Sequence, residues 1–340
     1  MHPIKYSIGR PIPQELIDKI IDLVAKEEGA QAALRSFALA CRAWLPRSRR
    51  RLFERIIITN GQVFERFLIF IESYPQIAAY IEAMEFLDGT RDVDGERDRP
   101  RWINDGIQRM PISVISRILR GVENLSVAHS TLSVPLLKTL IYSLPKLSTL
   151  TVGDLQWTDS CHPRRTISGH RVSGVRTLEI TDVLYIGILL RCVGSSLEEL
   201  RINLPDTRLH NASDTDHLMS QWTDLEDLDL GPYKNLHSLR FSHRHADDAN
   251  LVTVYRFLLR VRHSKIRSIY FKIEGVDSLP IPSHGPSIDD VLRAEAFNNL
   301  EEVVVILNRS KIDQQKAKEE YGKYLSVPMK RGILQILPLH

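Results

Sequence analysis

Six arginines lie close together near the N-terminal end of the chain, and they are the first residues whose spacing could carry chemistry. They are Arg42, Arg47, Arg49, Arg50, Arg51 and Arg55, with Glu54 as the only acid among them. Such a basic run can bind the phosphate groups of a nucleic acid. Leu52 and Phe53 interrupt the run, however, which is typical of the solvated face of a helix that starts at Pro46. We favour the helix and keep nucleic-acid binding as the weaker alternative.

Residue types that bind metal ions occur in the stretch 88–105, but without the spacing of a metal site. Asp92, Asp94 and Gly95 only faintly resemble a calcium loop. The glycine comes two positions early, and Ile103 stands where a glutamate is required. We therefore interpret this stretch as an insertion at the surface.

Two further pairs, Cys161 with His162 and His243 with His245, offer two ligand types each. A structural zinc ion needs four ligands at characteristic spacing, and nothing in the sequence supplies the rest. The chain also has no glycine-rich phosphate loop, no G-x-S-x-G turn and no H-E-x-x-H helix. We therefore expect no metal, no cofactor and no catalytic residue, and a protein that is not an enzyme.

The whole chain of 340 residues combines ample apolar content with a nearly balanced charge. Hydrophobic residues make up 43% and the formal net charge is +3, so charge alone does not argue for a nucleic acid or a membrane surface. The three cysteines are too few and too scattered for a disulfide framework, which indicates a reducing compartment, the cytoplasm or the nucleus. No stretch approaches the roughly 20 apolar residues of a membrane helix, and we see no signal-peptide pattern.

The arginine run belongs to a unit of apolar residues at helical spacing over residues 11–58. Pro13 suits the first turn of a helix. The apolar residues that follow form one broad face: Leu16, Ile17, Ile20, Ile21 and Val24. Gly29 ends this helix, and a second apolar run from Leu34 to Leu45 is broken by Pro46. A unit of this size cannot bury so many apolar residues alone, so we expect some of them to contact a partner.

This unit resembles an F-box, and its sequence is similar to those of the large F-box-like families of fungi. The resemblance rests on Ile12-Pro13-x-Glu15-Leu16-x-x-x-Ile20-x-x-x-Val24, on Ala40-Cys41-Arg42-x-Trp44 and on Leu52-Phe53. The family more often has Leu-Pro and Val-Cys at the first and second of these places. The resemblance implies that a set of residues contacts a Skp-type adaptor or forms the core beneath that contact: Ile12, Pro13, Leu16, Ile17, Ile20, Ile21, Val24, Cys41 and Trp44. A helical cap without a partner is the alternative.

From residue 81 onward, a hexad of the form apolar, two variable, apolar, one variable, apolar occurs nine times. Its copies begin at Ile81, Val122, Leu147, Val175, Leu197, Leu225, Leu236, Ile266 and Leu300. Helix signals lie between the copies, including a capping serine at Ser133 and a terminating glycine at Gly194. Each unit therefore reads as strand, loop and helix, and stacked units predict a parallel sheet with helices outside it.

One step of this array breaks the pattern. The hexads at Leu225 and Leu236 start only 11 residues apart, with Gly231 and Pro232 between them, so no helix fits. We predict that the second of the two is a strand of the sheet. The hexad 225–230 is then a short extra strand or the end of the preceding segment.

The array resembles leucine-rich repeats, which implies an α/β fold: an irregular right-handed solenoid of parallel strands and outer helices over residues 59–340, after the F-box-like unit. The starts from Val122 to Leu197 are 25, 28 and 22 residues apart, within the range of that family. Three residues after the last apolar position the family usually has Asn or Cys, whereas this chain has Ser130, Leu155, Val183 and Pro205. The turns must therefore be stabilised otherwise, and we expect uneven curvature.

The third and fifth residues of each hexad point away from the core, because strand side chains alternate. They are small and neutral in early hexads, as at Thr149 and Thr151, and include charged and aromatic types later. Arginine and tyrosine often anchor interfaces. We therefore predict that a protein target binds at Arg201, Arg240, Ser268 and Tyr270. The loop 156–174, with Trp157, Arg164 and Arg165, is the alternative.

Together the two resemblances imply a substrate-recognition adaptor of an SCF (Skp–cullin–F-box) ubiquitin ligase. In that role the F-box binds the Skp-type adaptor, and through it a cullin, while the repeats hold a protein target beside the ubiquitin-loaded enzyme and so raise its local concentration. The alternative is a leucine-rich-repeat scaffold that binds proteins and has no role in a ubiquitin ligase.

Overall fold

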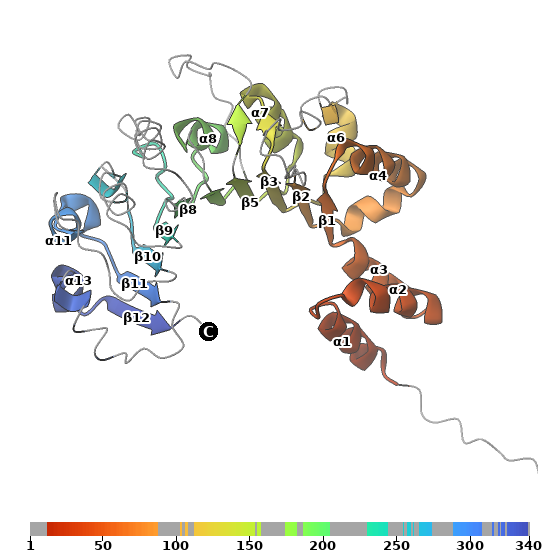
Figure 1. Ribbon diagram of the computed structural model, residues 1–340, viewed down its shortest axis with the longest axis horizontal. Helices are drawn as coiled ribbons and strands as arrows, with labels where there is room; N and C mark the ends of the chain where they lie inside the picture. Colours follow the sequence, from red (N-terminus) through yellow and green to blue (C-terminus); the bar gives the residue numbers. More distant parts are fainter. Residues whose placement is uncertain are drawn as a thin grey trace, which may run out of the picture.

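The computed structural model describes a helical N-terminal region followed by a large parallel sheet. The described residues are 12–87, 103, 106–107, 112–153, 155–157, 174–181, 186–204, 230–243, 254, 257–259, 261, 265–273, 288–307, 315, 319, 321–323 and 325–338. The sheet bends into an arch whose inner side is lined by the strands, with helices on the outer side (Figure 1). The α/β class and the parallel sheet with outer helices are therefore as predicted from the hexads.

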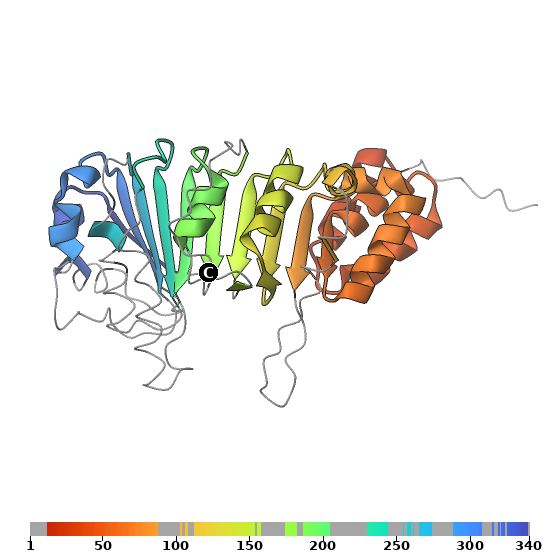
Figure 2. The same cartoon turned by 90° about the horizontal axis from the view of Figure 1, so that it is seen from above.

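The large sheet has ten strands, and each pairs with its neighbour along the chain in parallel. They are β1 (Arg55–Ile58), β2 (Ala83–Leu87), β3 (Asn124–Ala128), β5 (Thr149–Gly153), β7 (Thr177–Thr181), β8 (Glu199–Leu204), β9 (Ser238–His243), β10 (Ser268–Ile273), β11 (Glu302–Leu307) and β12 (Leu334–Pro338). Seen from above, they lie side by side, with the N-terminal helices beyond β1 (Figure 2). Eight of the nine hexads coincide with strands of this sheet, and their first, fourth and sixth residues are buried.

One backbone hydrogen-bond pattern recurs at each step from β1 to β11. The carbonyl oxygen of the second hexad residue accepts from the N–H groups of the second and third residues of the next hexad. Glu198, for example, accepts from His237 at 3.0 Å and from Ser238 at 3.2 Å. Because the same carbonyl is used each time, equivalent hexad positions lie beside one another across the sheet. This alignment determines which outward side chains can meet.

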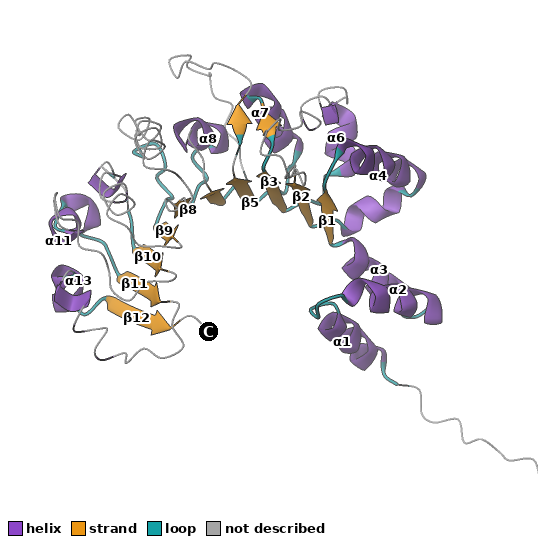
Figure 3. Cartoon of the chain, viewed as in Figure 1, coloured by secondary structure: helices purple, strands orange, loops and turns teal. Residues whose placement is uncertain are grey.

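The helices lie in the N-terminal region and on the outer side of the arch (Figure 3). Their bounds are α1 (Gln14–Val24), α2 (Ala30–Ala40), α3 (Leu45–Phe53), α4 (Gly61–Ser73), α6 (Ile112–Ile118), α7 (Val134–Ser143), α8 (Ile186–Val193), α11 (Ile288–Leu292) and α13 (Ser326–Lys330), with 3-10 turns η1 (Pro75–Tyr80) and η4 (Glu295–Phe297). Ser133 caps α7 as predicted, because its hydroxyl accepts from the N–H of Leu136 at 3.4 Å. Gly194, with φ of 79°, follows the end of α8.

The turn after β3 is one of those where the sequence lacks the asparagine that the expected resemblance to leucine-rich repeats would call for. Ser130 is buried, and its hydroxyl donates to the carbonyl oxygen of Ala128 at 2.8 Å. Beyond it, β4 (Thr131–Leu132) and β6 (Gln156–Trp157) form a second, two-stranded parallel sheet. A buried hydroxyl and the short strand β4, which pairs with β6 after β5, therefore stabilise this turn.

The pairing of β8 with β9 shows that the second of the two closely spaced hexads forms a strand of the sheet. β8 pairs directly with β9, so the hexad at Leu236 forms a strand of the sheet, as predicted, and β8 and β9 are adjacent in the order of the sheet. Residues 225–229 of the other hexad lie outside the described residues, and Leu230 is buried. Within the described ranges, no helix is long and apolar enough to cross a membrane.

Two strands of the sheet were not expected from the sequence. β1 lies inside the range 11–58 of the helical unit, and β12 follows the last hexad. Only Glu54 separates α3 from β1, and its carbonyl oxygen accepts from the N–H groups of Glu82 and Ala83, both at 2.9 Å. The helical unit therefore continues into the sheet without a linker.

Candidate interaction surfaces

Helix α1 is apolar on two sides, and only one of them is used inside the protein. The inner side packs through Ile21, which is buried, with Ile17 and Val24 half-buried beside it. The outer side carries Leu16, Ile20 and Leu23, whose spacing of three or four places them in one row along the helix. Ile12, two residues before the helix begins, adds a fourth exposed apolar side chain. We call these the apolar stripe: Ile12, Leu16, Ile20 and Leu23. Leu16 is 50% exposed and Ile20 is 49% exposed, so the single broad face predicted from the sequence divides into a core side and a free side.

The nine residues expected at the Skp contact or in the core beneath it divide in the same way. Five are exposed: Ile12, Pro13, Leu16, Ile20 and Cys41. Three are half-buried: Ile17, Val24 and Trp44. Ile21 is buried and belongs to the core. The ring of Trp44 meets that of Phe37 edge to face, with centroids 5.5 Å apart, so Trp44 also stabilises the unit itself.

Two exposed apolar residues of the helical region were missed. Leu23 completes the apolar stripe, and its spacing from Ile20 could have revealed it. Leu39 on α2 is 88% exposed, and no pattern in its neighbourhood distinguishes it from a core leucine. Both add to the apolar surface that the helical unit presents to solvent.

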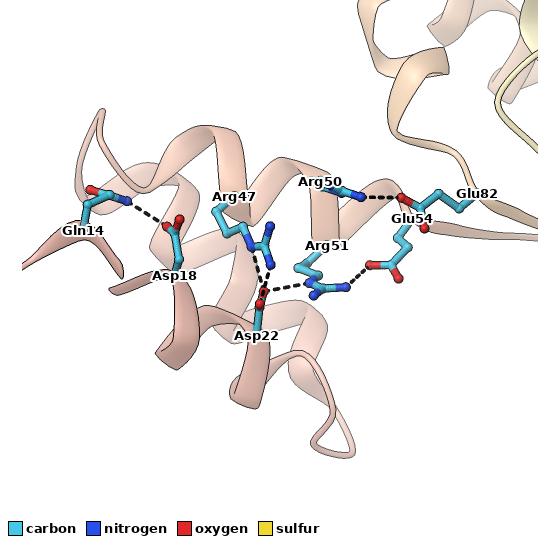
Figure 4. A network of polar contacts seen from close by, with 8 residues as sticks. All are labelled: Gln14, Asp18, Asp22, Arg47, Arg50, Arg51, Glu54 and Glu82. Atoms are coloured by element: carbon cyan, nitrogen blue, oxygen red, sulfur yellow. Dashed lines mark hydrogen bonds and ion pairs between the residues drawn. The ribbon is translucent and has the colours of Figure 1, made fainter. Parts of the chain in front are cut away.

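The arginine run lies on and beside α3, and much of it is used within the protein (Figure 4). The carboxylate of Asp22 on α1 accepts hydrogen bonds from two arginines. Arg47 donates through Nε at 2.7 Å and through Nη2, and Arg51 donates through Nε at 2.9 Å. These bonds hold the pKa of Asp22 well below its usual value. Arg51 also donates to Glu54 at 2.6 Å. The run is therefore a helix surface, as expected, but its inner arginines face α1 instead of solvent.

Two more arginines of the run connect the helical unit to the sheet. Arg50 donates to Glu82 at 2.8 Å, and Arg55 forms an ion pair with Glu85. Arg42 and Arg49 remain exposed. With four of the six arginines engaged in ion pairs, few cations are left to bind the phosphates of a nucleic acid.

The inner face of the arch carries a row of linked side chains from β7 to β11. We call it the charge ladder, in order along the sheet: Glu179, Arg201, Glu199, Arg240, Tyr270 and Glu302. Arg201 donates to Glu199 at 2.8 Å, and its Nη1 lies 3.7 Å from Glu179. Arg240 forms an ion pair with Glu199, although the geometry is not that of a hydrogen bond. The predicted target residues Arg201 and Arg240 are thus brought together by one carboxylate.

Tyr270 connects the ladder to the last repeats. The guanidinium carbon of Arg240 lies over its ring, 4.3 Å from the centroid, and its hydroxyl donates to Glu302. Burial and this hydrogen bond to an anion raise the pKa of Tyr270. Ser268, the fourth predicted residue, lies next to Glu302 and Ser238 in the sheet. All four predicted residues therefore share one surface.

The inner face of the arch, toward which the third and fifth hexad residues point, is not exposed to solvent at every position. Ser238 and Val304 occupy outward hexad positions, the third and the fifth, yet both are buried. Val304 lies in register between Tyr270 and Gln335, so a residue that points away from the core is buried there by its neighbours. The face is therefore covered at these two positions, whereas Gln335 beside Val304 is exposed.

The other candidate sites give weaker indications of function. A cavity of about 10 Å³ beneath β2 is lined entirely by apolar residues, among them Phe64, Phe86 and Ile115, and holds one water at most. Within the described ranges, no three potential metal-ligating side chains lie together. Residues 158–173 of the loop alternative, Cys161–His162, residues 244–245 and the insertion 88–105, except Ile103, lie outside those ranges.

Comparison of the sequence with models of known protein families gave no match, and comparison with curated protein sequences gave none. The apolar stripe and the charge ladder are therefore the features from which function is inferred.

Proposed function

We propose that this protein is a substrate-recognition adaptor of an SCF ubiquitin ligase. In this proposal residues 11–58 are an F-box that binds a Skp-type adaptor, and through it a cullin. The arch is an irregular right-handed leucine-rich-repeat solenoid that binds a protein target. The protein does no bond chemistry itself; it holds the target at high local concentration beside the ubiquitin-loaded enzyme.

The observation that carries the proposal is the apolar stripe on α1. Its four side chains are at least 49% exposed, although the helix has a separate apolar side for the core. Apolar side chains gathered on one face of a soluble unit mark a protein contact. The stripe includes Ile12, Leu16 and Ile20 of the F-box-like motif, and Pro13 lies at its start. A helix with two apolar sides suits a unit that packs on its own protein and on a partner at once.

The joint between the helical unit and the sheet supports the same role. α3 leads into β1 through one residue, and ion pairs from Arg50 and Arg55 reach β2 and the residue before it. A target on the sheet is therefore held in a defined position relative to a partner on α1. Such an arrangement lets an adaptor present its target to an enzyme held elsewhere in the complex.

Capture of a purified Skp-type adaptor tests the proposal. Leu16→Glu combined with Ile20→Glu should abolish capture, because two charges would be buried at the contact. Both positions are half-exposed, so the variant should fold, which circular dichroism and thermal unfolding check. Ile69→Glu on α4, where the wild-type side chain is 64% exposed, is the matched control and should leave capture unchanged. A folded double variant that still captures the adaptor would show that the F-box assignment is wrong.

The target site is proposed on the charge ladder. Alanine at both Arg240 and Tyr270 should weaken target capture by at least about 2 kcal/mol, as expected for interface anchors, and leave adaptor capture intact. If the double variant still recovers its targets while shortening of the loop 156–174 loses them, the site lies on that loop.

A scaffold without a ligase role is the second candidate. The ion pairs of Arg50 and Arg55 fit it as well as they fit the adaptor, because they would also fix a helical cap over the first strand. Capture from cells separates the two: recovery of Skp and cullin supports the adaptor, and recovery of targets without either supports the scaffold.

A further inference from the structure

Arg201 and Arg240 lie directly opposite each other on β8 and β9. Like charges in opposite positions of neighbouring strands repel each other unless a counter-charge lies between them. Here Glu199 is that counter-charge, since it contacts both guanidinium groups. One carboxylate therefore serves two cations at the centre of the charge ladder.

The shared carboxylate lies deeper than the cations that it serves. The side chain of Glu199 is 14% exposed, whereas those of Arg201 and Arg240 are 37% and 43% exposed. The next carboxylate, Glu179, is 3.7 Å from Arg201 and also accepts from the amide of Asn203 at 3.0 Å. A partner that approaches the inner face of the arch therefore meets the guanidinium groups of Arg201 and Arg240, which are more exposed than the carboxylates that they contact.

The two guanidinium groups are held in place and retain unused donors. Each has five N–H donors. Among the described residues, Arg201 makes one hydrogen bond, from Nη2 to Glu199, and Arg240 makes an ion pair with Glu199 through Nε but no hydrogen bond. Arg240 rests on the ring of Tyr270, whose hydroxyl is in turn held by Glu302. A fixed pair of this kind loses little side-chain entropy when it binds a planar anion.

We propose that the target docks through an acidic segment, with an aspartate or glutamate carboxylate bound by Arg201 and Arg240. The inference rests on the proposed function, because it concerns the surface assigned there to the target. Arg201 has Glu199 and Glu179 as counter-charges, whereas among the described residues Arg240 has only the shared Glu199. An incoming carboxylate gives Arg240 a counter-charge that it does not share. Arginine suits this task because its planar fork matches the two oxygens of a carboxylate.

The charge balance of the face favours a carboxylate over a phosphate. The outward positions of β7 to β11 carry three cations and three anions: Arg201, Arg240 and Lys272 against Glu179, Glu199 and Glu302. A carboxylate adds one negative charge, whereas a phosphate monoester adds roughly 1.5–2 beside the same glutamates. The repulsion is therefore smaller for an acidic protein segment than for a phosphorylated one.

Fluorescence anisotropy with the full chain and short labelled peptides tests this inference. A peptide that alternates glutamate and serine should bind, with an affinity that falls as salt is added. The matched peptide with lysine in place of glutamate should not bind. Arg201→Gln and Arg240→Gln should each weaken binding of the acidic peptide by about tenfold or more. Arg176→Gln, at an exposed arginine 3.8 Å from Glu198, is the matched control and should change nothing.

Glu199→Gln gives a test of opposite sign. Removal of the competing carboxylate should strengthen binding of the acidic peptide by about threefold to tenfold, because Arg240 then lacks its counter-charge among the described residues and Arg201 keeps only Glu179, at 3.7 Å. Absence of acidic-peptide binding, weaker binding by Glu199→Gln, or tighter binding of a phosphoserine peptide than of the glutamate peptide would each overturn the inference.

This assay does not involve a Skp-type adaptor. Loss of adaptor capture with acidic-peptide binding intact would therefore reject the ligase role alone. Adaptor capture without acidic-peptide binding would reject the inference alone.

Discussion

Asp22 on α1 and Arg51 on α3 are joined by an ion pair of 2.9 Å, and the same carboxylate also accepts from Arg47 (Figure 4). Arg51 continues the chain of contacts to Glu54, the residue that leads into β1. α1 is thereby held against α3, and its apolar stripe is held in a fixed direction relative to the sheet. The charges around α3 thus orient the surface that we propose for the adaptor.

The first prediction concerns this carboxylate. Asp22→Asn should lower the free energy of unfolding at pH 7 by about 1–2 kcal/mol, because two guanidinium groups lose their shared counter-charge at a site that is only partly exposed. The carboxylate of Asp18 accepts a hydrogen bond of 2.8 Å from Gln14 at an exposed site, so Asp18→Asn should change the free energy of unfolding little. Urea unfolding measures both.

The effect should also depend on pH. The hydrogen bonds from Arg47 and Arg51 depress the folded pKa of Asp22, so its contribution is complete above the unfolded pKa of about 3.9 and is lost as the pH falls below it. The difference in stability between wild type and Asp22→Asn should therefore shrink below about pH 4. A difference that stays constant as long as the protein remains folded would contradict this account.

The sheet was predictable because each strand buries one face, which leaves apolar residues at fixed hexad positions. β1 was not predicted because its hexad, which starts at Phe53, runs directly on from a helix. β12 was not predicted because Arg331 occupies the first position of its hexad, where the other hexads have an apolar residue. That arginine instead donates to three carbonyl groups, including Leu300 at 2.8 Å. A polar residue that satisfies backbone carbonyls takes over the role of an apolar one there.

The candidate surfaces were predictable in residue type but not in arrangement. The hexads place Arg201, Arg240 and Tyr270 outward, yet their shared contacts depend on how strands from distant parts of the chain align. The division of α1 into a core side and a free side likewise depends on where α2 and α3 pack. Val304 shows the same limit, since its position in a strand gives the direction of its side chain but not what covers it.

The second prediction separates the two faces of the sheet. Alanine at Leu200, Leu239 or Ile269, each fully buried at the fourth hexad position, should cost roughly 2–5 kcal/mol, because it leaves a cavity. Thr151→Ala on the outward face should stay within about 0.5 kcal/mol. Chemical unfolding measures both, and equal losses on the two faces would mean that the strands are misassigned. Arg201→Ala is not a neutral control, because its guanidinium group pairs with Glu199.

The third prediction is a gain in stability. Ser48 on α3 is fully buried, and its hydroxyl has no hydrogen-bond partner within the described ranges. Ser48→Ala removes an unsatisfied buried group and places a better helix former in α3, so we expect a gain of about 1 kcal/mol. Ser36→Ala on α2, where the exposed hydroxyl donates to Ala32 at 3.0 Å, should change little. A loss of stability in Ser48→Ala would show that the hydroxyl is bonded after all.

The last prediction concerns the C-terminal end of the arch, where Asp289 on α11 holds the start of α13. Its buried carboxylate accepts from the N–H groups of Ser326 and Val327, both at 2.9 Å, and from the hydroxyl of Ser326. These are the free donors of a helix N-terminus, and a carboxylate there also has a favourable charge.

Asp289→Asn replaces an accepting oxygen by an N–H₂ group that faces other donors, so we expect a loss of about 2 kcal/mol in thermal or urea unfolding. The neighbouring Asp290→Asn is the matched control. Its carboxylate is exposed and pairs with Arg293 at 2.9 Å, which is worth about 0.5 kcal/mol or less. Hydrogen exchange should show the loss of protection in Asp289→Asn first at α13 and β12, because these elements follow the cap. Equal losses in the two variants, or loss of protection that begins at α1, would show that Asp289 does not hold this end of the sheet.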